Sequence, residues 1–145
     1  MQEILIRKLH SYLQRNNPDI LIELQSEQKV TAYLVGKVSS IDSLLDQLLI
    51  EGRPPMIVEE ICLDALTEDL RPSRYSFIES ILEEEFTQTH RRFQEASILT
   101  FEVLNMVATC KPIFDRIQYT EEMEDNRQLR HVVIGMIAEY LENNK

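Results

Sequence analysis

The chain has 145 residues, of which 43% are hydrophobic and 28% are charged. This length suits a single domain with one buried core, and the composition excludes a disordered chain. The formal net charge of −10 disfavours direct binding to nucleic acid, because an acidic surface repels the phosphate backbone. Only three glycines and five prolines are present, which favours long helices over many turns.

Neither a membrane span nor a disulfide is predicted. Nowhere do about 18 apolar residues follow one another, and the amino-terminal segment carries charges at every turn, so we expect no signal peptide and no membrane contact. Cys62 and Cys110 lie far apart, and neither belongs to a CxxC motif, which excludes a disulfide framework and a zinc site. We therefore expect two packing cysteines in the reducing setting of the cytoplasm.

The first half of the chain reads as helices separated by breaks. Residues 3–15 place apolar side chains on one face, and an Asn-Asn-Pro sequence ends this helix at residues 16–18. A second helix is expected over residues 19–38. Ser39 and Asp42 have the spacing of a capping box, so a third helix follows and ends at Gly52, a residue suited to a helix C-terminus.

The second half continues in the same way. Pro54 and Pro55 introduce a helix over residues 55–69, and Ser76 and Glu79 repeat the capping-box spacing at the start of a helix that runs to Cys110. A short segment, an acidic loop and a last helix over residues 127–143 follow. No segment shows the alternation typical of a strand. We predict an all-α fold, a single compact domain over residues 1–145 with about six helices in an orthogonal or irregular bundle.

Acidic residues concentrate in the middle of the chain. Residues 42–85 carry three basic against twelve acidic side chains, ending in the segment YSFIESILEEEF. On a helix, Glu83 and Glu84 rotate away from the apolar face, whereas Glu85 falls on its edge. We therefore expect Glu85 to be partly buried and paired with an arginine or a backbone N–H of another segment, so that its loss costs more stability than loss of either neighbour.

No constellation of reactive side chains is present. The histidines His10, His90 and His131 stand on three different expected helices, and no E-x-x-H pair, P-loop, GxGxxG or GxSxG motif occurs. We expect no catalytic residue, no metal and no cofactor. The candidate interaction or buried-polar positions are Glu85, His90, Arg91 and Arg92. An intrahelical ion pair with Glu95 is the simplest role for Arg91 or Arg92.

Four segments carry a resemblance to a known family: YLQRNNPDIL, LRPSRYSFIESILEEEF, KPIFDRIQYTEE and IAEYLENN. Together they resemble a family of small bacterial proteins called domain of unknown function 1896. The resemblance covers most of the chain. It implies an all-helical fold and an association with mobile or conjugative elements, and it implies no catalytic residue.

Three functions remain open from the sequence. The first is a non-enzymatic protein–protein interaction or regulatory module that presents its acidic surface to a partner or to itself. The second is an accessory protein of a mobile or conjugative element that acts on nucleic-acid machinery. The third is a carboxylate-based metal protein or enzyme. An exposed apolar patch beside the acidic helices would favour the first.

Overall fold

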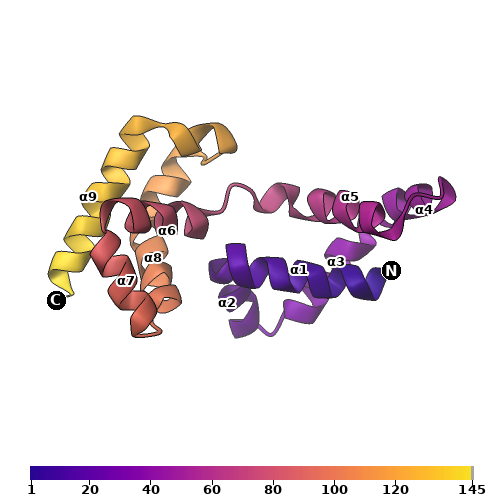
Figure 1. Cartoon of the computed structure of the whole chain (residues 1–145), viewed down its shortest axis with the longest axis horizontal. Helices are drawn as coiled ribbons and strands as arrows, with labels where there is room; N and C mark the ends of the chain where they lie inside the picture. Colours follow the sequence, from indigo (N-terminus) through magenta and orange to yellow (C-terminus); the bar gives the residue numbers. More distant parts are fainter. Residues whose placement is uncertain (145) are drawn as a thin grey trace. The chain divides into compact units, whose positions relative to one another are not determined.

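The computed structural model describes residues 1–144, and within that range it contains nine α-helices, two short 3-10 helices and no strand (Figure 1). The all-α prediction is confirmed, whereas the expected number of about six helices is wrong. The chain packs as two compact units, residues 1–71 and the part from Pro72 onward, each with its own apolar core. That residues 1–145 act as one domain stays a prediction.

The first unit is built around its first helix. Its elements are α1 (Gln2–Asn16), α2 (Pro18–Ser26), α3 (Val30–Ser39), α4 (Asp42–Ile50), α5 (Pro55–Thr67) and the 3-10 helix η1 (Glu68–Leu70). Leu5, Leu9 and Leu13 recur every fourth residue along α1 and are fully buried. Helix α1 packs against α2, α3 and α5, so these leucines form the centre of the core.

The second unit is organised in the same manner around α6. Its elements are α6 (Arg74–Glu85), α7 (Thr87–Glu95), α8 (Leu99–Ile117), the 3-10 helix η2 (Glu121–Asp125) and α9 (Arg127–Asn143). Helix α6 packs against α7, α8 and α9. The rings of Phe77, Phe114 and Tyr119 meet at one end of this core, with centroids 4.9–6.0 Å apart.

Two of the breaks that produce additional helices are turns in the left-handed backbone region, and a third lies at Phe86, whose φ is −131°. Gly52, with a φ of 71°, ends α4 as predicted, and the Arg53 N–H bonds to the Leu48 carbonyl. Gln28 and Ser97, with φ of 57° and 60°, end α2 and α7 through the same pattern of backbone bonds. The helices expected over residues 19–38 and up to Cys110 are therefore broken, although neither break contains a glycine.

The predicted capping boxes do not form. Ser39 is the last residue of α3, and the backbone stays close to helical up to Ile41. Ile41 therefore occupies the N-cap position of α4, and Ser39 does not cap this helix. In the second unit Ser73, three residues before Ser76, caps α6 by accepting a bond from the Ser76 N–H. The helix expected to end at Cys110 continues to Ile117 as part of α8, with Pro112 inside it.

The two units repeat one helical arrangement. In each, a long helix is followed by a corner of a single residue, a helix of nine residues, a left-handed turn and a third helix. The corner residues Asn17 (φ −136°, ψ 50°) and Phe86 (φ −131°, ψ 49°) have nearly the same backbone angles. Asn17 and Phe86 are 69 positions apart, and so are Gln28 and Ser97.

Equivalent positions of the two units also carry the buried side chains. At the same spacing, Leu9, Leu13, Leu34 and Val38 correspond to Ile78, Leu82, Val103 and Val107, all of which are buried. At a spacing of 71, the buried residues Val58, Cys62 and Leu66 of α5 correspond to Leu129, Val133 and Ile137 of α9. The same pairs of helices pack together in both units, with α8 taking the place of α3 and α4. The chain thus contains two copies of one helical unit.

Replacing Gly52 by Ala should destabilise the first unit by about 1 kcal/mol, because an L-residue is strained at this positive φ. A new Cβ would meet no atom within 4 Å, so the cost comes from the backbone alone. The control is Gly36→Ala inside α3, where space is also open and about 0.5–1 kcal/mol of stabilisation is expected. Urea unfolding followed by circular dichroism measures both, and effects of the same sign would contradict this account.

Candidate functional site

Three consecutive glutamates end α6, and two of them, Glu84 and Glu85, face an arginine of α9. Arg130 Nη2 lies 2.6 Å from Glu84 Oε2 and 3.2 Å from Glu85 Oε1. The bonds to Glu85 and then Glu84 raise the pKa of Arg130. Glu85 therefore has an arginine from another segment, as expected, but its side chain is 45% exposed and shares this partner with Glu84. The difference in burial on which the special place of Glu85 depended is small.

His90 is the buried polar residue among the predicted positions. It lies in α7 with 6% of its surface exposed, and its Nε2 atom is 3.8 Å from Glu79 Oε1 of α6. No described residue forms a hydrogen bond with this nitrogen. The fold brings Glu79 beside His90 because α6 and α7 meet at the Phe86 corner.

Arg91 and Arg92 are both exposed on α7 and do not form the expected pair with Glu95. Arg92 Nη2 donates to Thr89 Oγ1 at 3.2 Å, and Arg91 makes no side-chain hydrogen bond or ion pair with the described residues. The four predicted positions therefore do not form one site. Glu85 lies with Glu84 and Arg130, His90 with Glu79, and the two arginines face outward. An interaction role for any of them stays a prediction.

A cluster of exposed apolar side chains, which the sequence did not indicate, surrounds the turn between α4 and α5. Ile50 and Met56 are 86% and 80% exposed, and Leu49 and Ile57 are 49% and 40% exposed. We call residues 49–57 the α4–α5 tip. Asp46 and Glu60, each exposed, precede Ile50 and follow Met56 by one helical turn and so lie on the same faces. The α4–α5 tip is thus apolar, and the adjacent turns of α4 and α5 are acidic.

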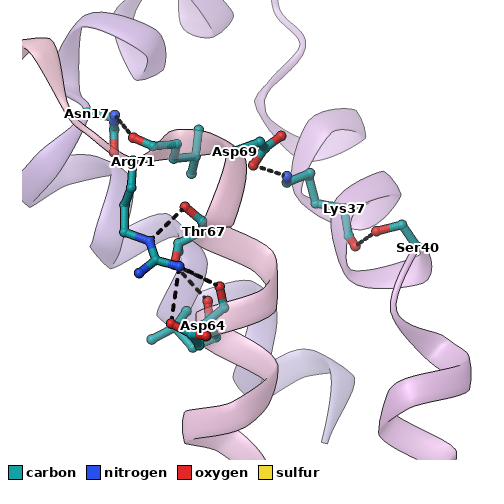
Figure 2. Close-up of polar contacts among 9 residues, drawn as sticks. Asn17, Lys37, Ser40, Asp64, Thr67, Asp69 and Arg71 are labelled. Atoms are coloured by element: carbon teal, nitrogen blue, oxygen red, sulfur yellow. Dashed lines mark hydrogen bonds and ion pairs between the residues drawn. The ribbon is translucent and has the colours of Figure 1, made fainter. Parts of the chain in front are cut away.

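Polar contacts fix the other end of α5, as Figure 2 shows. The Arg71 guanidinium turns back to the carbonyls of Thr67 and Asp64 and to the Asp64 carboxylate, 3.2 Å away. Lys37 Nζ of α3 lies 2.6 Å from Asp69 Oδ1. The buried Asn17 donates from Nδ2 to the Leu70 carbonyl at 3.2 Å. These contacts hold the 3-10 helix η1 against α1 and α3, which is a structural role.

Two neighbouring hollows lie between α1 and α5. The first, of about 350 Å³, is lined chiefly by Arg7, Lys8, Ser11, Tyr12, Arg15 and Leu63. The second, of about 470 Å³, shares Tyr12 and Leu63 with the first and continues to Glu60, Ile61, Asp64 and Arg71. We call the two together the α1–α5 groove. Its first part is basic although the protein carries a net charge of −10.

The described residues contain neither a metal-binding cluster nor a membrane-spanning helix. Within residues 1–144, no three His, Cys, Asp or Glu side chains lie together as they would around a metal ion. In the same range, no helix combines the length and the apolar character needed to cross a membrane. Cys62 and Cys110 are free and buried, and burial raises the pKa of both thiols, that of Cys110 to about 11.

Fold and surface together define a class: an all-α protein of two similar helical units with exposed apolar and charged surfaces. The chain belongs to the family described as a domain of unknown function (DUF1896), whose model matches residues 5–145. This confirms the family resemblance seen in the sequence. No curated protein and no solved structure matches the chain.

A double-mutant cycle between Arg130→Ala and Glu84→Ala should give a coupling energy of about 0.2–1 kcal/mol at low salt, and less at high salt, because the pair is exposed and screened. The same cycle with Glu85 should give a similar value. Urea unfolding measures the free energies. Glu83→Ala is the control, because this side chain has no ion pair. A coupling to Glu85 far above that to Glu84 would restore the special role expected from the sequence.

Both cysteines should react slowly with iodoacetamide at pH 8 in the native protein and quickly in urea, because burial keeps the thiols protonated. As pH rises from 9 towards 11, thiols of the unfolded chain ionise before Cys110 does in the folded chain. The difference between the two pKa values of Cys110 therefore stabilises the folded state fully below pH 9, and this stabilisation is lost as the pH rises from 9 to about 11. Native labelling as fast as labelling in urea would contradict this prediction.

Proposed function

We propose that this chain is a non-enzymatic protein–protein interaction or regulatory module and that the α4–α5 tip is its main contact surface. The exposure of the tip carries the proposal. Ile50 and Met56 leave most of their apolar surface in water, which costs free energy that a partner would recover. Large apolar side chains at the end of a short hairpin can enter a pocket on a partner with little rearrangement of the backbone.

The charges behind the tip indicate the chemistry of the partner. Asp46 and Glu60 lie one turn from the apolar end, and neither makes an ion pair with the described residues. Glu51 differs, because its hydrogen bond with Arg53 lowers its pKa and occupies its charge. A partner surface with an apolar pocket bordered by cations would therefore complement the tip. We place this interaction in the cytoplasm, where free cysteines are maintained.

The alternative of a carboxylate-based metal protein or enzyme requires carboxylates from several helices to converge in a pocket. Glu84 and Glu85 come from one helix, and the partner that they share is the guanidinium group of Arg130. Nothing in the described geometry favours the accessory role on nucleic-acid machinery over a general interaction module, and that role comes from the family resemblance alone. The interaction module is therefore the function that the exposed surface supports best.

The double variant Ile50→Ser and Met56→Ser should abolish capture of the partner from a lysate of the source organism while leaving the melting temperature nearly unchanged, because both side chains are exposed. The captured protein is then purified, and direct binding is measured with wild type and variant. Phe101→Ser, which alters an apolar side chain that is 63% exposed in the second unit, is the control.

Two results would count against the tip. Equal binding of the partner by wild type and the tip variant would remove the tip from the interface. Loss of binding with the Phe101 variant alone would assign the contact to the start of α8. Sedimentation velocity of the purified chain adds a separate measurement, because self-association that disappears in the tip variant would identify a second copy as the partner.

A further inference from the structure

Two arginines in the α1–α5 groove have no partner. Arg7 and Arg15 line its basic part, and neither forms a hydrogen bond or an ion pair with any described residue. Lys8 beside them differs, because its Nζ atom lies 2.8 Å from Glu59 Oε2 of α5. The first hollow therefore presents two uncompensated positive charges, both of which persist at every physiological pH because guanidinium groups do not lose their proton. In the second hollow, Glu60 adds a carboxylate without an ion pair to any described residue, and Arg71 is paired with Asp64.

The spacing of the arginines limits what they can bind. Eight residues separate Arg7 from Arg15, which corresponds to about 12 Å along a helix. Both follow the buried leucines of α1 by two positions and so lie on the opposite side of the helix, with Ser11 between them. Two cations so far apart are poorly placed to converge on one small anion. They suit two separate anionic groups on one extended ligand.

The walls of the groove are partly apolar. Tyr12 and Leu63 lie where the basic hollow meets the second hollow, so an occupant of both would pass over these two side chains. Each hollow has the volume of an ordinary small-ligand site, about 350 and 470 Å³, and together they exceed what a single anion would fill. A ligand that places acidic groups at the two arginines of the first hollow and apolar groups over Tyr12 and Leu63 would match both the charge and the walls, whereas Glu60 disfavours a further acid in the second hollow.

The second copy of the helical unit shows that the fold does not require this charge. At a spacing of 69, Ser76 and Glu84 stand where the first unit has Arg7 and Arg15. At a spacing of 71, Arg130 stands where the first unit has Glu59. In the first unit the cation of the ion pair lies on α1 and the anion on α5, whereas in the second unit the anion lies on α6 and the cation on α9. The second unit therefore keeps its core without a cation at either of the two positions that correspond to Arg7 and Arg15. The basic groove is a property of the first unit alone.

We propose that the α1–α5 groove binds an acidic peptide segment of a protein partner. Arg7 and Arg15 each receive a carboxylate, and Tyr12 and Leu63 contact apolar side chains between the two acids. The inference rests on the proposed function only in that the occupant is a protein. Glu60 stands beside the α4–α5 tip and also lines the second hollow, but the proposed contacts use residues of the first hollow, none of which belongs to the tip.

Other occupants fit the groove less well. A second copy of this chain also carries a net charge of −10, and its Glu84 and Glu85 are already paired with Arg130. A nucleic acid would place a continuous run of phosphates on only two free cations, which neutralises few of its charges. A peptide with two or three acids matches the available charge.

The test uses the full chain and a fluorescein-labelled synthetic peptide of alternating glutamate and leucine. Fluorescence anisotropy at low salt should show binding that weakens as salt is added. The double variant Arg7→Ala and Arg15→Ala should weaken binding by about tenfold or more, because it removes both charge-assisted contacts. The matched control is Arg116→Ala with Arg127→Ala, which changes the net charge equally in the second unit. It should bind the peptide as wild type does.

Several outcomes would overturn the proposal. These are no binding by wild type, equal weakening by the control variant, and equal binding of a peptide with glutamine in place of glutamate. Tighter binding of a single-stranded oligonucleotide that depends on Arg7 and Arg15 would make the groove a phosphate site instead. Self-association that the groove variant abolishes would make a second copy the occupant. Because the probe is synthetic and the tip is intact in every variant, failure here leaves the proposed function of the tip untouched.

Discussion

Burial of the leucines along α1 is the constraint on which the first unit depends. Leu5, Leu9 and Leu13 are fully buried, and each contributes about 2 kcal/mol of hydrophobic free energy. Because they form a single stripe, they fix how α1 is rotated about its axis. Helices α2, α3 and α5 pack against that stripe, and the opposite side of α1 must then face outward. The direction in which Arg7 and Arg15 point therefore follows from the core.

Charge plays a different part from burial in this protein. Several ion pairs of the described residues join two exposed side chains, and such pairs stabilise a fold only slightly. Lys8 with Glu59 and Arg130 with Glu84 hold equivalent helices together with opposite signs, so the sign of the pair is free to vary while the apolar core is kept. The surface charge can therefore differ between the two units without loss of either core.

The sequence predicted those features that local patterns encode. The first and last helices, expected over residues 3–15 and 127–143, agree with α1 and α9 within a residue or two, and Gly52 ends α4. Gln28 and Ser97 gave no signal, because only tertiary packing holds such residues in a left-handed turn. The apolar tip was missed since Ile50 and Met56 look like core residues until the packing is known. The partners of Glu85 and His90 likewise depend on contacts between helices.

Because one chain contains both helical units, a substitution can change one unit without changing the other, which is impossible in a symmetric assembly of identical subunits. In a homodimer every substitution appears twice, so a change that suits one subunit is imposed on the other. Here the two copies are encoded separately. The buried Leu21 of the first copy corresponds, 69 positions later, to the buried His90 of the second, so one packing site carries an ionisable ring while its counterpart stays aliphatic. Selection can therefore specialise one half of the molecule while the other continues to serve as scaffold.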